Sequence, residues 1–280
     1  MNDSSLDIIN PDSSSSANAP EPPLTPQAPA SPPAPQHLPR VGPSFGWLLL
    51  FFVLFFASAV FYVVGYGAVL GYQSAMQGVA LPEPAQIEVM IQEHLGQPNG
   101  LAGLYLLQCL ILLPVIAAVA HFRTQHWSVT LGFRRFAVQS LAVWMMIWLA
   151  YLAITYVINL LADVDPGDFM RSLNGSQHFG VALVLVIGAP LLEELIFRGY
   201  LFKAWRHSRL GLSGTLLLTS ALFTALHLSQ YNWTYLSMIF ALSLILGLAR
   251  EKSGSIWVPL AIHAANNLVA TVTIIYLGML

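Results

Sequence analysis

Five ionisable side chains interrupt the apolar part of this sequence, where hydrocarbon-like residues dominate on both sides. They are Glu193, Glu194, Arg198, His227 and His263. An ionised group at the centre of a bilayer costs at least about 2.5 kcal/mol, so such groups mark a functional site by default. Carboxylates and imidazoles are the side chains that most often accept and return protons in catalysis. The set therefore predicts proton-transfer chemistry, such as the activation of a water molecule.

The spacing of the two carboxylates predicts different roles for them. Consecutive helical residues are about 100° apart, so Glu193 and Glu194 are not expected to aim at the same point. Glu194 and Arg198 are four residues apart, in the favourable order for an ion pair. That pair would neutralise Glu194 and leave Glu193 free for chemistry, although a purely structural pair fits the same spacing. Pro190 lacks an N–H group and predicts a kink or a water-accessible notch nearby.

Two further segments carry polar residues at helical spacing. His263 and Asn267 share one helix face, and His227 shares a stripe with Phe223. Taken singly, each could hold helices together; taken together with Glu193, they are the parts needed to activate water and stabilise an oxyanion. The helical rise places Glu193 at about 15 Å depth, His263 at about 11 Å and His227 at about 21 Å. His227 therefore requires its helix to start later or to tilt.

The composition indicates that lipid is the solvent of most of the chain. Of its 280 residues, 56% are hydrophobic and only 9% are charged, whereas soluble domains have about 25% charged residues. The single cysteine, Cys109, excludes an intrachain disulfide and a cysteine-based zinc cage. A net charge of −2 gives no reason to expect nucleic acid as a partner.

The apolar runs predict an all-α polytopic membrane protein with about seven transmembrane helices. About 20 apolar residues cross a bilayer as a helix, and the runs show no alternation typical of a β-barrel. The predicted spans are 46–71, 101–121, 137–160, 179–203, 213–229, 233–249 and 256–278. A short amphipathic helix is predicted from Pro84 to Leu95, on the outer face.

The charges of the loops predict the orientation. Basic residues collect in the cytoplasmic loops of membrane proteins. Nine of the 11 basic residues fall on one side of the predicted spans, namely Arg40, Arg123, Arg134, Arg135, Lys203, Arg206, Arg209, Arg250 and Lys252. The prediction is therefore a cytoplasmic N-terminus and a C-terminus outside.

Three regions follow from this pattern. Residues 1–43 are rich in proline, serine and alanine, and we expect a disordered tail because they bury too little apolar surface. Residues 44–178 hold three predicted transmembrane helices with their loops. Residues 179–280 form the predicted catalytic transmembrane core, which holds all the polar residues described above.

Three motifs in this core resemble those of a known family. The sequence shows Glu-Glu-x-x-x-Arg at 193–198, Phe-x-x-x-His at 223–227 and His-x-x-x-Asn at 263–267, each on its own apolar segment. In this order and placement they resemble the CAAX-protease and bacteriocin-processing family of intramembrane endopeptidases. The resemblance covers roughly residues 179–270, and the other helices match only as generic membrane helices.

This resemblance implies hydrolysis of a peptide bond in a site open to the cytoplasm. Glu193 would activate the water and His227 would assist it, while His263 and Asn267 would stabilise the oxyanion. Glu194 and Arg198 would support them. Members are often described as metallopeptidases, and Glu193, His227 and His263 could form a zinc site; a metal-free glutamate mechanism remains open. No organic cofactor is expected.

The expected partners are the lipid bilayer and a membrane-embedded or lipid-anchored protein or peptide substrate. The expected location is a bacterial plasma membrane. Two other functions compete with the protease. One is a non-catalytic scaffold or bacteriocin-immunity protein that keeps the site as a relic. The other is a transporter or proton relay, which would also place Glu and His in the membrane, but a transporter usually shows inverted repeats, and none is evident.

Overall fold

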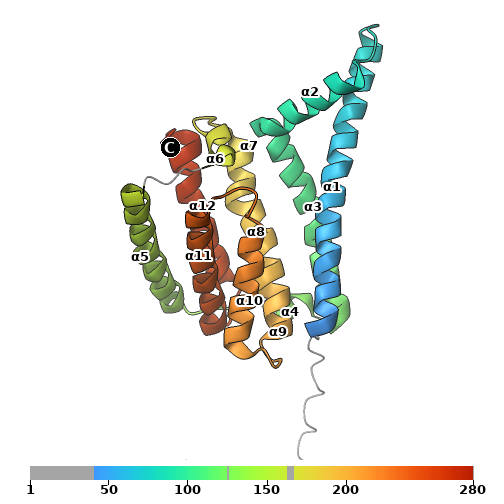
Figure 1. Cartoon of the computed structure of the whole chain (residues 1–280). Helices are drawn as coiled ribbons and strands as arrows, with labels where there is room; N and C mark the ends of the chain where they lie inside the picture. Colours follow the sequence, from blue (N-terminus) through green and yellow to red (C-terminus); the bar gives the residue numbers. More distant parts are fainter. Residues whose placement is uncertain (1–40, 125, 163–166, 280) are drawn as a thin grey trace, which may run out of the picture. The chain divides into compact units, whose positions relative to one another are not determined.

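The computed structural model describes residues 41–124, 126–162 and 167–279, and every regular element in these ranges is helical (Figure 1). The elements are α1 (Val41–Met76), α2 (Pro84–Gly96), α3 (Pro98–Thr124), α4 (Trp127–Leu131), α5 (Val138–Ala162), α6 (Asp168–Leu173), α7 (Phe179–Leu183), η1 (Val184–Gly188), α8 (Ala189–Glu194), η2 (Leu195–Leu201), α9 (Phe202–Trp205), α10 (Gly211–Ala225), α11 (Trp233–Ser253), α12 (Trp257–Thr271) and η3 (Val272–Tyr276). The η elements are π-helices. Residues 1–40 of the predicted tail lie outside the described residues, whereas its last three residues, 41–43, are helical and begin α1 instead.

Six helical stretches in the described residues are long and apolar enough to cross a membrane. They are Val41–Met76, Pro98–Phe122, Val138–Ala162, Phe179–Trp205, Trp233–Ser253 and Trp257–Tyr276. The fifth predicted span, 213–229, is shorter than expected, because α10 has 15 residues and ends at Ala225. At 1.5 Å per residue α10 is about 22 Å long, less than the roughly 30 Å of a hydrocarbon core.

The N-terminal helices flank the core and expose large apolar surfaces. Helix α1 packs against α3, and α2 contacts both. The predicted short helix at 84–95 is confirmed as α2. In its first turn the backbone N–H of Glu83 donates to the Gln86 side chain, 3.2 Å away. Only 6% of the apolar window of α5 is buried, so its remaining surface suits contact with lipid.

The polar motif residues lie in the packed C-terminal half of the chain. Helix α10 packs along α11, α11 packs against α12, and α12 also contacts η1 and α8 (Figure 1). One apolar cluster joins α1, α3, η2 and α9 around Phe51, Ile116, Tyr200 and Trp205. A second joins α5, α11 and α12 around Leu246 and other buried side chains. The site thus lies on helices held from two sides by close packing.

Three of the basic loops are tied together at one end of these helices. The Ser255 hydroxyl donates to the Arg134 carbonyl at 2.7 Å, and two nitrogens of the Arg206 side chain donate to Glu251 at 2.8 and 2.6 Å. The loops after α4, α9 and α11 therefore share one end, as the charge pattern requires. Which side of the membrane this end faces stays a prediction.

Single cysteines in a Cys109→Ser background would test the orientation. We expect His126→Cys and His207→Cys, on exposed positions at the basic end, to resist a membrane-impermeant thiol reagent in intact cells. Gln97→Cys and Ser172→Cys, exposed at other loops, should react, because basic loops stay in the cytoplasm. Labelling of His207→Cys from outside before permeabilisation would reverse the predicted orientation.

Candidate active site

The two carboxylates of the first motif lie on a helix whose winding changes twice. The stretch from Phe179 to Trp205 is α-helical at its ends and at α8, and π-helical at η1 and η2. Glu193 and Glu194 are the last two residues of α8, directly before η2. Single π-helical turns inside α-helices occur frequently at functional sites. They shift the direction in which the side chains that follow them point.

Pro190 explains the first change of winding. The N–H of Ala189 donates to the Val184 carbonyl, a π-type bond that spans five residues. The next donor in that register would be Pro190, which has no N–H. The Leu185 carbonyl is therefore left without that bond, and the side-chain amide of Asn267 donates to it at 2.9 Å. The sequence predicted a kink or a water-accessible notch near Pro190, and the structure shows instead a π-helix that is hydrogen-bonded to α12.

Glu194 and Arg198 form the predicted ion pair, and it is completely buried. The guanidinium Nη1 donates to Glu194 Oε1 at 2.7 Å, and the side chains are 1% and 0% exposed. Arg198 Nη2 donates to the hydroxyl and the carbonyl of Ser243 on α11, at 2.7 and 3.0 Å. The guanidinium also lies over the ring of Phe223, 4.7 Å from its centroid. The pair thus links η2 to α10 and α11.

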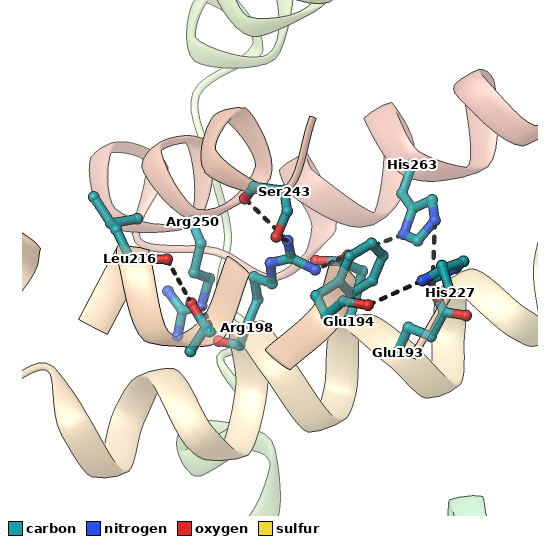
Figure 2. A network of polar contacts seen from close by, with 10 residues as sticks. Glu193, Glu194, Arg198, Leu216, His227, Ser243, Arg250 and His263 are labelled. Carbon is teal, nitrogen blue, oxygen red and sulfur yellow. Dashed lines mark hydrogen bonds and ion pairs between the residues drawn. The ribbon is translucent and has the colours of Figure 1, made fainter. Parts of the chain in front are cut away.

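His263 lies between the two carboxylates (Figure 2). Its Nδ1 is 2.9 Å from Glu194 Oε1, and its Nε2 is 3.6 Å from Glu193 Oε2. An ionised carboxylate only accepts hydrogen bonds, so Nδ1 carries the proton of the neutral ring and Nε2 presents a lone pair to Glu193. Glu193 and Glu194 thus do not aim at the same atom, as the sequence predicted, but one imidazole lies between them and meets each carboxylate with a different nitrogen.

Exposure separates the two carboxylates as the sequence predicted. The Glu193 side chain is 24% exposed, whereas that of Glu194 is inaccessible. Glu194 forms ion pairs with both Arg198 and His263. Among the described residues, the one ion-pair contact of Glu193 is with His263 Nε2. Glu193 is therefore the carboxylate that a water molecule or a substrate can reach.

His227 joins the site from the turn after α10. Its Nδ1 donates to the Phe223 carbonyl at 2.9 Å, which leaves the Nε2 lone pair free. The Phe223 ring contacts His227 and His263 at centroid distances of 5.1 and 5.7 Å. The depth difference calculated from ideal helices therefore does not separate the two imidazoles. Figure 2 shows Glu193, His227 and His263 on the same side of the buried Arg198.

Asn267 is held next to this group but makes no hydrogen bond to Glu193, His227 or His263 within the described ranges. One amide hydrogen is donated to Leu185, as described above. The amide has a second hydrogen that remains available. Asn267 also lines a cavity of about 80 Å³, together with Tyr231 and apolar side chains of α6, α12 and η3.

A metal centre was the other interpretation of Glu193, His227 and His263. In the part of the chain that the structure describes, no three His, Cys, Asp or Glu side chains are grouped so that they could hold a metal ion. The proposed zinc ligands thus do not form a ligand set in this arrangement. No step of the reaction proposed below passes through a metal.

Sequence spacing missed three contributors to the site. Ser243 and Arg250 lie 45 and 52 residues from Arg198 in the sequence. Nevertheless, Ser243 accepts a hydrogen bond from the Arg198 guanidinium, and Arg250 Nε donates to the Arg198 backbone carbonyl at 3.0 Å. Arg250 was assigned only to a basic loop. Tyr231, whose ring lies 6.0 Å from that of His227, was not singled out. A polar residue in the middle of an apolar run, such as Ser243, was the only signal available.

Comparison with known proteins bears on the same segment. Residues 175–269 match the family model of the type II CAAX prenyl endopeptidase Rce1-like proteins. This match confirms the resemblance of the core to the CAAX-protease family. It includes all seven motif residues, which run from Glu193 to Asn267.

Two curated bacterial proteins are also similar to the chain. An uncharacterized 24.3 kDa protein of Escherichia coli is 34% identical over 117 residues, which cover 41% of this chain and 49% of the relative. The uncharacterized protein YpbD of Bacillus subtilis (strain 168) is 28% identical over 119 residues, 38% of this chain and 58% of the relative. The chain thus spans about half the length of the curated relatives it matches. No solved structure matches it.

With its six long apolar helices, the chain is a multi-pass integral membrane protein. Its relatives come from bacteria, which supports the predicted location in a bacterial plasma membrane.

Glu194→Gln should destabilise the protein strongly. The change leaves the buried Arg198 charge without its partner, and removing one member of a buried pair costs about 3–5 kcal/mol. The matched control is Glu251→Gln, whose partner Arg206 is 29% exposed; loss of such a surface pair costs about 0–1 kcal/mol. Thermal unfolding of both variants in one detergent checks this. Equal losses of stability would show that the Arg198 pair carries no special weight.

The link between Asn267 and Pro190 can be tested with a double-mutant cycle. Asn267→Leu strands the Leu185 carbonyl, which should cost about 1–3 kcal/mol. Pro190→Ala restores an N–H that can serve the same carbonyl. In the Pro190→Ala background, Asn267→Leu should therefore cost clearly less, as measured by the free energies of unfolding. Strictly additive effects would contradict the assignment of this carbonyl to Asn267.

Proposed function

We propose that the chain is an intramembrane endopeptidase that hydrolyses a peptide bond of a membrane-associated protein or peptide. The observation that supports this most directly is the 3.6 Å gap between Glu193 Oε2 and His263 Nε2. When Glu193 is ionised and His263 is neutral, both atoms are acceptors and face each other without a donor. A water molecule can donate one hydrogen to each, which positions it for activation.

In the proposed reaction Glu193 is the general base. Glu193 accepts a proton from the water as the oxygen adds to the carbonyl carbon of the substrate, and the carbonyl becomes an oxyanion. The protonated Glu193 then returns the proton to the leaving amine as the carbon–nitrogen bond breaks. Burial of the site away from bulk water strengthens each of these interactions.

The other residues hold this arrangement in place. Glu194 fixes the proton of His263 on Nδ1 and is itself neutralised by Arg198. His227, with its free Nε2, assists proton transfer beside Glu193. Asn267 has one amide hydrogen left after its bond to Leu185, and this hydrogen stabilises the oxyanion.

We also propose that substrates reach the site from the cytoplasm, as the positive-inside pattern and the family resemblance together indicate. His227 lies beyond the end of α10 that is remote from the basic loops. Access from the basic end therefore requires a path of about 22 Å, the length of α10. The cysteine-labelling experiment described above tests the orientation on which this part depends.

Glu193→Gln should abolish turnover while the protein still accumulates in the membrane. The amide keeps the size of the side chain but cannot act as a base. We expect membrane proteomics to show the same uncleaved substrates in a deletion strain and in a Glu193→Gln strain. Glu88→Gln, an exposed carboxylate on α2, should behave like wild type. A Glu193→Gln strain indistinguishable from wild type would instead support the scaffold or immunity function.

The same turnover assay on purified protein addresses the metal. Under the glutamate mechanism, activity should survive exhaustive treatment with a strong chelator, with less than stoichiometric metal by elemental analysis. Stoichiometric zinc that is lost together with activity and restores it when added back would decide for a metalloenzyme.

A further inference from the structure

A phenol next to the site has no assigned role. Tyr231 lies in the turn between α10 and α11, four residues after His227. Its backbone N–H donates to the His227 carbonyl at 3.2 Å, and the two rings lie 6.0 Å apart. The following residue, Asn232, accepts the N–H of Tyr235 with its side chain and so fixes the start of α11. Tyr231 is therefore held at a set distance from the catalytic imidazole.

The hydroxyl of Tyr231 makes no hydrogen bond within the described residues, although the side chain is largely buried. Tyr231 lines the same 80 Å³ cavity as Asn267. This volume is several times the roughly 10–15 Å³ that one water needs, so a peptide carbonyl fits there. The rest of the lining is apolar apart from Thr271. Tyr231 and Asn267 are thus two donors on a mainly apolar wall, one beside His227 and the other one helical turn after His263.

The surroundings also keep this hydroxyl protonated. Burial raises the pKa of Tyr231, and Tyr105 and the negative charge of Glu193 raise it further. A phenol in such a place can donate a hydrogen bond but cannot act as a base.

We propose that Tyr231 is a second oxyanion donor of the endopeptidase, paired with the free amide hydrogen of Asn267. The inference rests on the proposed function. As the water oxygen adds to the substrate carbonyl and Glu193 takes the proton, the electron pair of the broken π bond moves to the carbonyl oxygen. The Tyr231 O–H and the Asn267 N–H donate to that oxygen. Neither proton is transferred, and the bonds relax when the carbonyl reforms.

Tyr231→Phe removes this hydroxyl and keeps the ring. The assay uses purified full-length protein in detergent with a mixture of synthetic peptides, and mass spectrometry measures cleavage that Glu193→Gln abolishes. Removal of one oxyanion donor typically lowers kcat by about 10²–10³-fold, and we expect that loss here, with KM and the melting temperature little changed.

Tyr151→Phe is the matched control. The Tyr151 hydroxyl donates to the Met238 carbonyl at 3.1 Å, so its loss should lower the melting temperature and leave kcat intact. Full kcat in Tyr231→Phe, or a loss of kcat that only follows a loss of folding, would overturn the role of Tyr231 while leaving the proposed function standing. If wild-type protein shows no Glu193-dependent cleavage, the proposed function fails and the role of Tyr231 fails with it.

Discussion

The buried guanidinium of Arg198 is the constraint around which the site is built. A charge taken out of water in the middle of a membrane helix is tolerated only with close partners. Arg198 finds them in Glu194, in the hydroxyl and carbonyl of Ser243 and in the face of Phe223. Because Arg198 lies on η2 and these partners lie on α8, α11 and α10, one charge fixes the relative positions of helices that apolar packing alone would leave free to slide.

Glu194 connects this ion pair to the chemistry of the site. Its Oε1 is shared by Arg198 and His263, so the position of the arginine decides which nitrogen of His263 keeps the proton. That choice leaves Nε2 facing Glu193, the only one of the two carboxylates that is accessible. Arg198 has no contact to the substrate, yet through Glu194 it sets the protonation of His263, which faces the reacting water. This is why the ion pair belongs to the mechanism as well as to the stability of the helices.

Two π-helices flank α8, the segment that carries both carboxylates. Neighbouring residues of an α-helix point about 100° apart, and Glu193 and Glu194 reach opposite nitrogens of the His263 ring. The π turns at η1 and η2 change the winding of the helix on either side of this pair. In this arrangement the backbone carbonyl of Leu185 has no helical hydrogen-bond partner, and the Asn267 side chain on α12 donates to it. The third motif is therefore tied to the first by a backbone defect that a proline produces.

The sequence by itself determined that lipid surrounds most of the chain, where nearly all of its helices lie, and which residues belong to the site. Long apolar runs, the alternation of loop charges and the rarity of ionisable groups in the spans are local properties, so they can be read without a structure. The Glu194–Arg198 pair was also predictable, because four residues of one helix bring the two side chains together. The length of α10 was not, since an apolar run does not show where a chain turns at His227.

The tertiary structure decided which atoms face one another. Glu194 and His263 are 69 residues apart, and Arg198 and Ser243 are 45 apart, so no helical period relates them. Only the packing of α11 and α12 against η2 and α8 shows that one imidazole serves both carboxylates, that Asn267 binds a backbone carbonyl, and that Tyr231 lies beside His227. Residue type sets the chemistry that a side chain can perform, and long-range packing sets the partner with which it performs it. The reason is that a hydrogen bond forms or fails over a few tenths of an ångström.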